Sequence, residues 1–397
     1  MSDHQAAEQM IGYLYQVRYA LLLLLENDDE QAQISIEKFD DISFSHDDTP
    51  EEMIQLKHHT KTYGDLTNAS TDMWRTIKVW ADLVGMDSTW LDSTRFVIIT
   101  TATAPAGTAA SFLKPLSKGL GRDTNIAFNI LKKTTETSKN SKHNGYYSSF
   151  NKLGDELGQK LVDNIFIIDG SSNIIDVKAD IRKEIRYGSL PKYEQRICER
   201  LEGWWYDKSI EFLSSDQPVF INQKQIRTLI ASIRDEYTED NLPIDTPILD
   251  EIEIENLPKK DRMFYEQLRL ICLSNQRINL AIRDYYRAFK QRANWIRDDL
   301  LYINELDRYE ERLIDEWQRM FFAMQEDLEE YGDELDEKTK QRHGKSLFDK
   351  IQDKDIRIRE RCSEPFIVRG SYHSLANRLS VGWHTNFEAR LQSLLAR

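Results

Sequence analysis

The sequence predicts an α/β domain in residues 1–175, followed by a mostly α-helical domain in residues 176–397. Helix and strand patterns alternate through the first region, which is typical of a layered α/β architecture. Beyond it, strand patterns nearly vanish and long helical patterns replace them. The 397 residues, 40% of them hydrophobic and 10% aromatic, are enough for two domains with buried cores.

The first element is a helix over residues 5–26, where apolar residues such as Met10, Leu14 and Leu21 recur at helical spacing. A second helix is predicted over residues 70–84. The strand patterns are QISIEKF (33–39), MIQLKHH (53–59), RFVIITTA (95–102) and NIFIIDG (164–170). The third of these is apolar on both faces, which predicts a central strand covered on both sides.

The carboxy-terminal half carries helical patterns and few strand signals. The predicted helices cover residues 176–213, 223–237, 258–291 and 294–330. The segment TEDNLPIDTP (238–247) predicts a turn or linker between them. Residues 301–335 are strongly acidic, and their apolar side chains keep helical spacing, which predicts an amphipathic helix with a solvated acidic face.

Charge and cysteine usage restrict the possible functions. The net charge of −14 means that any contact with nucleic acid must come from a local basic surface. The three cysteines, Cys198, Cys272 and Cys362, are far apart and fit a reducing cytoplasm better than a disulfide framework or a zinc site. The longest apolar run, Ala20–Leu25, is too short to span a bilayer.

A group of polar residues in the first two strand patterns predicts a metal site. Strand residues two apart share a face, so Gln55 and Lys57 point together, away from the core. If the two strands pair as a hairpin, Glu37 and Asp41 face them. Oxygens of Glu37, Asp41 and Gln55 would suit Mg²⁺ or Mn²⁺. Such a cation polarises a phosphate while Lys57 orients the attacking water, which is the chemistry of phosphodiester hydrolysis.

Two alternatives stay open for these acids. Asp40 competes with Asp41 for the role of ligand, because parity favours Asp41 but a bulge after Phe39 would reverse the assignment. The second alternative is a solvated turn without metal. Of the two histidines that follow, His59 shares the parity of Lys57, whereas His58 is expected to be structural.

The ordered set of motifs resembles the PD-(D/E)xK nucleases, in the branch where the acid before the lysine is Gln. GYLYQ (12–16) resembles the Gly-x-x-Tyr-Gln helix that opens the Cap-type effector nucleases of bacterial antiphage systems. This resemblance implies a restriction-endonuclease-like fold for the first domain. It also implies that Gln16 lies near an active site built from the acids, Gln55 and Lys57.

A local excess of positive charge predicts contact with double-stranded DNA without sequence reading. Residues 114–152 carry eight basic residues against two acids in a chain of net charge −14. The expected DNA-binding residues are Lys114, Lys118, Arg122, Lys132, Lys133, Lys139 and Lys142. Lysines on a loop-rich surface contact phosphates rather than bases, although a solvated loop would carry the same residues.

The carboxy-terminal tail carries a second resemblance. PFIVRGSYHSLANRLSVGWHTNF (365–387) and IRDEY…DNLP (233–243) resemble segments of ABC three-component system proteins. With the nuclease motifs, the chain resembles the A subunit of Lamassu antiphage systems. This implies an SMC/Rad50-like ATPase and a small adaptor as partners. It also implies a nuclease that is inactive in the complex and active after release as a homo-oligomer, expected to be a tetramer.

Together these observations predict a Mg²⁺-dependent DNA endonuclease that acts as a defence effector. The alternative is a non-catalytic assembly subunit whose helical half docks an ATPase. A third possibility, a sequence-specific DNA regulator, has no helix-turn-helix with a basic recognition helix to support it. The sequence contains neither a phosphate-binding GK[ST] loop nor a GxSxG nucleophile elbow, so the chain is not expected to hydrolyse ATP or act through a serine.

Overall fold

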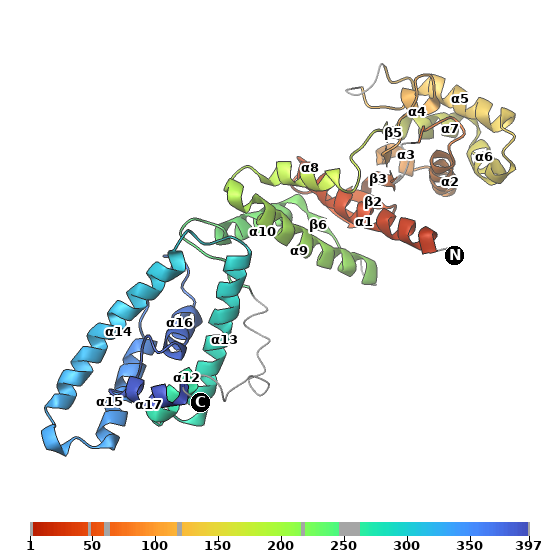
Figure 1. Cartoon of the computed structure of the whole chain (residues 1–397). Coiled ribbons are helices and arrows are strands. Elements are labelled where there is room, and N and C mark those ends of the chain that lie inside the picture. The colour runs from red at the N-terminus through yellow and green to blue at the C-terminus, as the bar shows by residue number, and fades with distance from the viewer. Residues whose placement is uncertain are drawn as a thin grey trace. The chain divides into compact units, whose positions relative to one another are not determined.

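The computed structural model describes residues 3–46, 49–58, 64–116, 121–215, 219–245 and 263–395 (Figure 1). The chain divides into two compact units, Met1–Asp235 and Glu236–Arg397. The boundary predicted between residues 175 and 176 therefore falls inside the first unit. The physical reason is that helices following residue 175 pack against the first helix of the chain, α1.

The amino-terminal unit is built on a six-stranded mixed sheet with strand order β5-β4-β3-β2-β1-β6. The strands are β1 (Gln33–Ile36), β2 (Ile42–His46), β3 (Thr49–Lys57), β4 (Arg95–Thr100), β5 (Ile165–Ile168) and β6 (Ile221–Asn222). β1, β2 and β3 form an antiparallel meander, and β6 pairs antiparallel with β1. β3, β4 and β5 are parallel. The sheet therefore changes direction at β3, the strand that carries Gln55 and Lys57.

Strand β2 was not predicted, and it corrects the expected hairpin. β1 ends at Ile36 instead of continuing through Phe39, and β2 lies between β1 and β3. Residues 37–41 form the turn that joins β1 to β2. The serines of β2 are buried like its apolar residues, and Ser43 Oγ lies 2.7 Å from Ser35 Oγ on β1. This pairing gives the buried hydroxyls of Ser35 and Ser43 a hydrogen-bond partner in each other.

Helices cover both faces of the sheet, as Figure 1 shows. The described helices of this unit are α1 (Asp3–Glu26), α2 (Thr71–Met86), α3 (Trp90–Ser93), α4 (Ala109–Phe112), α5 (Thr124–Thr137), α6 (Asn144–Lys152), α7 (Gly154–Asn164), α8 (Asp176–Ile185), α9 (Glu194–Ser214) and α10 (Gln223–Glu236). One core joins α2 and α4–α7 to alternate residues of β3–β5, including Met53, Phe96 and Ile98. Ile54 and Leu56 are equally buried but point to the opposite face.

The segment between β4 and β5 is mostly helical, which corrects the loop-rich surface expected for the basic residues. α5 begins after Asp123, whose carboxylate accepts a hydrogen bond from the backbone N–H of Ile126 at 2.9 Å. This is a typical amino-terminal cap. Phe128 and Leu131 of α5 are buried, so the basic residues of this helix lie on its remaining surface.

The carboxy-terminal unit consists of helices among its described residues. They are α12 (Met263–Leu270), α13 (Asn275–Arg297), α14 (Glu305–Glu329), α15 (Glu337–Gln352), α16 (Pro365–Asn377) and α17 (Phe387–Leu395). Two predicted helices are interrupted where Cys272 and Asn304 adopt left-handed backbone angles, with φ of 57° and 59°. Throughout the described ranges, the helices are too short or too polar to traverse a bilayer.

The tail motif predicted from the sequence forms the centre of this unit. Gly370 of α16 lies against α13 so closely that an added Cβ would overlap the carbonyl oxygen of Asp284. Gln267 of α12 donates to the carbonyl oxygens of Ala376 and Val381 and accepts from the N–H of Trp383. A buried glutamine that satisfies three backbone groups fixes the turn after α16.

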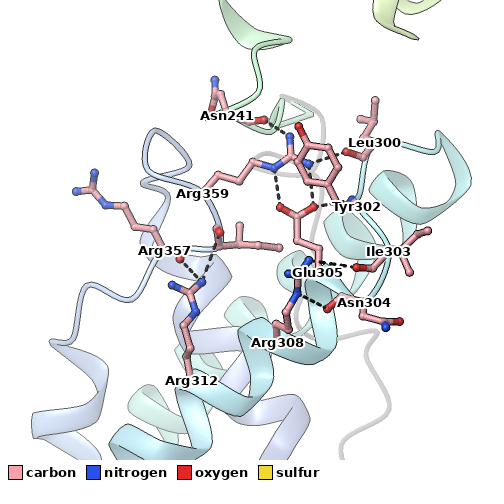
Figure 2. Close-up of polar contacts among 11 residues, drawn as sticks. Asn241, Leu300, Tyr302, Ile303, Asn304, Glu305, Arg308, Arg312, Arg357 and Arg359 are labelled. Carbon is pink, nitrogen blue, oxygen red and sulfur yellow. Dashed lines mark hydrogen bonds and ion pairs between the residues drawn. The ribbon is translucent and has the colours of Figure 1, made fainter.

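A buried arginine, Arg359, joins separate segments of the helical unit (Figure 2). Arg359 binds both carboxylate oxygens of Glu305, at 2.7 and 2.8 Å, and donates to the carbonyl oxygens of Asn241 and Leu300. Its guanidinium lies 4.6 Å from the ring centroid of Tyr302. These contacts give the buried guanidinium of Arg359 hydrogen-bond acceptors in place of water. They also join the segment after α15 to the start of α14.

Candidate functional site

Residues 37–41, termed here the acidic turn, bring three carboxylates to the end of β3. The backbone N–H of Glu37 donates to the carbonyl oxygen of Asp41 at 3.1 Å, which closes the turn. Glu37 has a left-handed backbone with φ of 56°. For a residue other than glycine this conformation costs roughly 1–2 kcal/mol, and such strain concentrates at functional sites.

Asp41 joins the acidic turn to β3. The β2–β3 ladder ends where Ile42 pairs with Ile54, so the N–H of Leu56 lies beyond its reach. The Asp41 carboxylate oxygen Oδ2 accepts that N–H at 2.8 Å. The side chain of Asp41 therefore extends the strand pairing and lies beside Gln55 and Lys57.

The acids and the lysine of the site lie within electrostatic reach of one another. Burial raises the pKa of Glu37, Asp41 and Asp40 raise it further, and Lys57 lowers it. Burial also raises the pKa of Asp40, to about 6, against the lowering effect of its hydrogen bond from Trp80. The raised pKa values of Glu37 and Asp40 beside one lysine indicate a site that favours an added positive charge.

Asp40 is held by α2, a contact that the sequence did not indicate. The indole N–H of Trp80 donates to Asp40 Oδ2 at 2.8 Å, and the backbone N–H of Asp41 donates to Asp40 Oδ1 at 3.0 Å. Trp80 is fully buried and its ring lies 5.2 Å from that of Phe96 on β4. No periodicity or motif predicts this contact, because it joins residues 40 positions apart through the tertiary fold.

Gln55 and Lys57 share one face of β3, as the alternation predicts, but that face also carries part of the core instead of pointing away from it. Both are half-buried, whereas Ile54 and Leu56 are buried on the opposite face. Gln55 and Lys57 share the parity of Met53, which belongs to the core beneath α2. They therefore lie on the same side of the sheet as Trp80.

Gln16 comes from α1, and the structure does not join it to the acidic turn. Its neighbour Tyr15 places its ring 4.4 Å from the ring of His58, the residue after β3, so this part of α1 lies near the end of that strand. Gln16 Oε1 is buried and accepts no hydrogen bond from the described residues. A buried amide oxygen without a donor is costly, so a water molecule or a cation at this position would stabilise it.

The two remaining polar candidates near β3 are His58 and His59, which follow Lys57 in the sequence. The backbone N–H of Ile174 lies 3.4 Å from His58 Nε2, so His58 contacts the protein interior on the face opposite Lys57. His59 lies outside the described residues, as does Lys118 among the basic candidates.

The donor set fits a hard divalent cation by its chemistry. Carboxylate oxygens of Glu37 and Asp41, with the amide oxygen of Gln55, are ligands that Mg²⁺ and Mn²⁺ accept. Within the described ranges, no three His, Cys, Asp or Glu side chains are grouped closely enough to hold a metal ion by themselves. A cation here would therefore also need Gln55, the backbone or water.

The basic candidates separate into two classes in the structure. Lys114 forms an ion pair with Asp169 at 2.7 Å, and Lys132 pairs with Asp155. Arg122 donates to the backbone carbonyl oxygens of residues 113 and 163, at 2.8 and 2.7 Å. These three side chains stabilise the helices between β4 and β5.

Lys133, Lys139 and Lys142 form the second class, termed here the lysine surface. All three are exposed, and none makes an ion pair with another described residue. Lys133 lies in the second half of α5, Lys142 lies in the short 3₁₀ helix Ser141–His143 that follows, and Lys139 lies in the link between them. His143 of that helix contacts Thr71, the first residue of α2, at 3.0 Å. Since the β3–β4 crossover runs through α2, this places the lysine surface toward the same end of the sheet as Lys57.

One region of the chain matches a known protein family. Residues 264–391 match the family described as C-terminal domain 7 of the ABC-three component (ABC-3C) systems. No curated protein matches the chain. The predicted resemblance of the tail to ABC three-component proteins is thereby confirmed.

Solved structures give distant matches. The Moraxella osloensis Cap4 SAVED/CARF-domain containing receptor is 14% identical over 71% of this chain and 69% of that chain, with a TM-score of 0.35. The Acinetobacter baumannii Cap4 SAVED/CARF-domain containing receptor with the cyclic trinucleotide 2′3′3′-cAAA is 13% identical, over 72% and 59%, with a TM-score of 0.33.

The family match covers most of the carboxy-terminal unit, and the packing of Gly370, Gln267 and Trp383 shows why the tail motif forms its core. The TM-scores of the Cap4 receptors are too low to support any further assignment. The carboxy-terminal unit therefore carries a region similar to C-terminal domain 7 of the ABC-three component systems.

Proposed function

We propose that this chain is the nuclease effector of an ABC-three component antiphage defence system, a Mg²⁺- or Mn²⁺-dependent endonuclease that cuts double-stranded DNA without sequence preference. The observation that carries the proposal is the Asp41–Leu56 hydrogen bond, which holds the acidic turn against β3 beside Lys57. An acidic pair and a lysine at one strand end are the groups that phosphodiester hydrolysis needs.

The roles of the residues follow from their positions. Glu37, Asp41 and Gln55 would hold the cation. When bound, it would supply charge neutralisation at the phosphate and a water of lowered pKa. Lys57 would orient that water or neutralise charge that develops on the phosphate. Gln16, with its buried amide oxygen, would order solvent at the end of β3.

A matched set of variants tests this proposal. Purified wild-type chain, free of partners, is expected to cut supercoiled plasmid with Mg²⁺ or Mn²⁺ and not with EDTA. Lys57→Ala should keep the thermal unfolding midpoint and lose cleavage. Lys224→Ala, which removes an exposed lysine from α10, should cut like wild type. Equal cleavage by Lys57→Ala and wild type would overturn the assignment.

Regulation by partners belongs to the same proposal. An SMC-like ATPase and a small adaptor would hold the effector inactive, and release would allow self-association into the cutting form, expected to be a tetramer. The match to an ABC-three component domain supports such partners. Mass photometry should detect a larger species in the active preparation. A chain that cuts DNA as a monomer would contradict activation by oligomerisation.

A second candidate function is a non-catalytic assembly subunit. Two observations favour it: the family match lies in the helical unit, and both Asp40 and Asp41 already accept hydrogen bonds from the protein. This candidate predicts tight binding to the ATPase partner and no cleavage with any metal. The plasmid assay with wild-type chain separates the two functions.

A further inference from the structure

The acidic turn is fixed to the protein from two sides. On one side, Asp41 Oδ2 accepts the backbone N–H of Leu56 on β3. On the other, Asp40 Oδ2 accepts the indole N–H of Trp80 from α2. Hydrogen bonds from a strand and from a helix therefore hold the acidic turn in place, next to the residues proposed to face the cation.

Hydrogen bonding distinguishes the two neighbouring aspartates. Both carboxylate oxygens of Asp40 accept hydrogen bonds, Oδ2 from Trp80 and Oδ1 from the backbone N–H of Asp41. Asp41 uses Oδ2 for Leu56, and its Oδ1 accepts no hydrogen bond from the described residues. Asp41 thus keeps a carboxylate oxygen for a ligand, whereas Asp40 directs its oxygens to the protein.

Trp80 provides a rigid anchor for this arrangement. Its side chain is 0% exposed and packs on Phe96 of the interior strand β4. A buried tryptophan has few alternative rotamers, so its N–H holds a fixed position. The bond to Asp40 thereby fixes the backbone at Asp41 and, through the N–H of Glu37, the strained end of the turn.

We propose that Asp40 and Trp80 are positioning residues, which hold the acidic turn so that Glu37 and Asp41 face the cation while Asp40 itself is not a ligand. This inference rests on the proposed nuclease function and adds to it the division of labour within the turn. Outer groups that orient metal-binding carboxylates commonly affect metal affinity by about 10–100-fold when removed.

The first test removes one N–H from the core. Trp80→Phe keeps an aromatic ring and loses the donor to Asp40. Trp74→Phe is the matched control, since Trp74 is equally buried in the same core and donates its indole N–H to the carbonyl oxygen of Asn68 at 2.7 Å. Isothermal titration calorimetry with Mn²⁺ should show about tenfold weaker binding for Trp80→Phe and wild-type affinity for Trp74→Phe.

Plasmid cleavage over a range of Mn²⁺ concentrations gives a second readout. Trp80→Phe and Asp40→Asn should need more Mn²⁺ for half-maximal cleavage and recover most of the wild-type rate at saturation. Asp41→Asn should stay inactive at every concentration. If Trp80→Phe does not fold, Asp40→Asn still supplies this comparison.

Three outcomes would count against the inference. If Trp80→Phe binds Mn²⁺ and cuts DNA like the wild type, the hydrogen bond from the indole to Asp40 does not position the acidic turn. A folded Asp40→Asn as inactive as Asp41→Asn at saturating Mn²⁺ makes Asp40 a ligand. A wild-type chain that neither binds Mn²⁺ nor cuts DNA overturns the nuclease function itself and, with it, the positioning role.

Discussion

At the residue scale, Asp41 combines a structural bond with a proposed ligand role. Its Oδ2 replaces the missing strand partner of Leu56, and its backbone carbonyl closes the acidic turn onto Glu37. The geometry that makes the site possible is thus held in part by a residue of the site. Stability and activity can be separated by choosing the substitution.

Asp41→Ala removes the acceptor and leaves the N–H of Leu56 without a partner. We expect the free energy of unfolding to fall by about 1–3 kcal/mol, measured by urea denaturation. Asp41→Asn keeps an acceptor oxygen and should lose less stability, while both variants lose cleavage because a carboxylate ligand is gone. Equal destabilisation by the two variants would show that the bond to Leu56 contributes little.

His373 gives a second prediction at the residue scale, in the helical unit. It is fully buried in α16, with Phe264 and Phe348 as ring neighbours at 5.5 and 6.0 Å. Burial lowers the pKa of His373 to about 3. The imidazole is therefore neutral in the folded chain.

The pH dependence follows from this lowered pKa. Below about pH 6.5 the unfolded chain binds a proton that the folded chain does not accept until about pH 3, so stability falls as pH falls through this window. Relative to His373→Leu, the wild type should lose about 1.4 kcal/mol of unfolding free energy per pH unit below about pH 6. Urea denaturation over that range measures the difference. Parallel curves for the two proteins would contradict a buried neutral imidazole.

At the element scale, α5, the 3₁₀ helix after it and the link between them carry the lysine surface. The sequence indicated a basic segment, but it did not indicate which of its basic side chains are available for contact with DNA. Lys114 and Lys132 form ion pairs and Arg122 caps backbone carbonyls, so their charges are already used within the fold. Lys133, Lys139 and Lys142 remain exposed and are the proposed phosphate contacts.

Replacing the three residues of the lysine surface with Gln should weaken binding to a labelled duplex at every sequence. The reason is that each lysine that neutralises a phosphate releases a counterion, so the slope of log affinity against log salt should fall by about 0.9 for every phosphate left without its lysine. Fluorescence anisotropy over a salt series measures this slope. The matched control is the triple Gln variant of Lys224, Lys290 and Lys350, which are likewise exposed. An equal change in the control would mean that net charge alone sets the affinity.

At the scale of the whole molecule, the chain divides between Asp235 and Glu236. The first unit contains the proposed site and the second contains the match to the ABC-three component domain. Catalysis and assembly are therefore expected to be separable, because the interactions that build each compact unit lie mostly within it.

A chain that ends at Asp235 tests this separation. It should fold, as judged by circular dichroism and a cooperative thermal transition, and should keep metal-dependent cleavage. It should lose co-purification with the SMC-like ATPase, because the proposed docking domain is missing. A truncated chain that still binds the ATPase would place the partner surface in the first unit.

The sequence by itself determined the local features of this protein. Alternation along β3 placed Gln55 and Lys57 opposite Ile54 and Leu56, and the tail motif indicated the three-component domain, because both depend on residues close together in the chain. The tertiary structure decided that β2 separates β1 from β3 and that Trp80 binds Asp40. It also decided which lysines stay exposed. These outcomes depend on strand register and on packing between distant segments, which no local pattern contains.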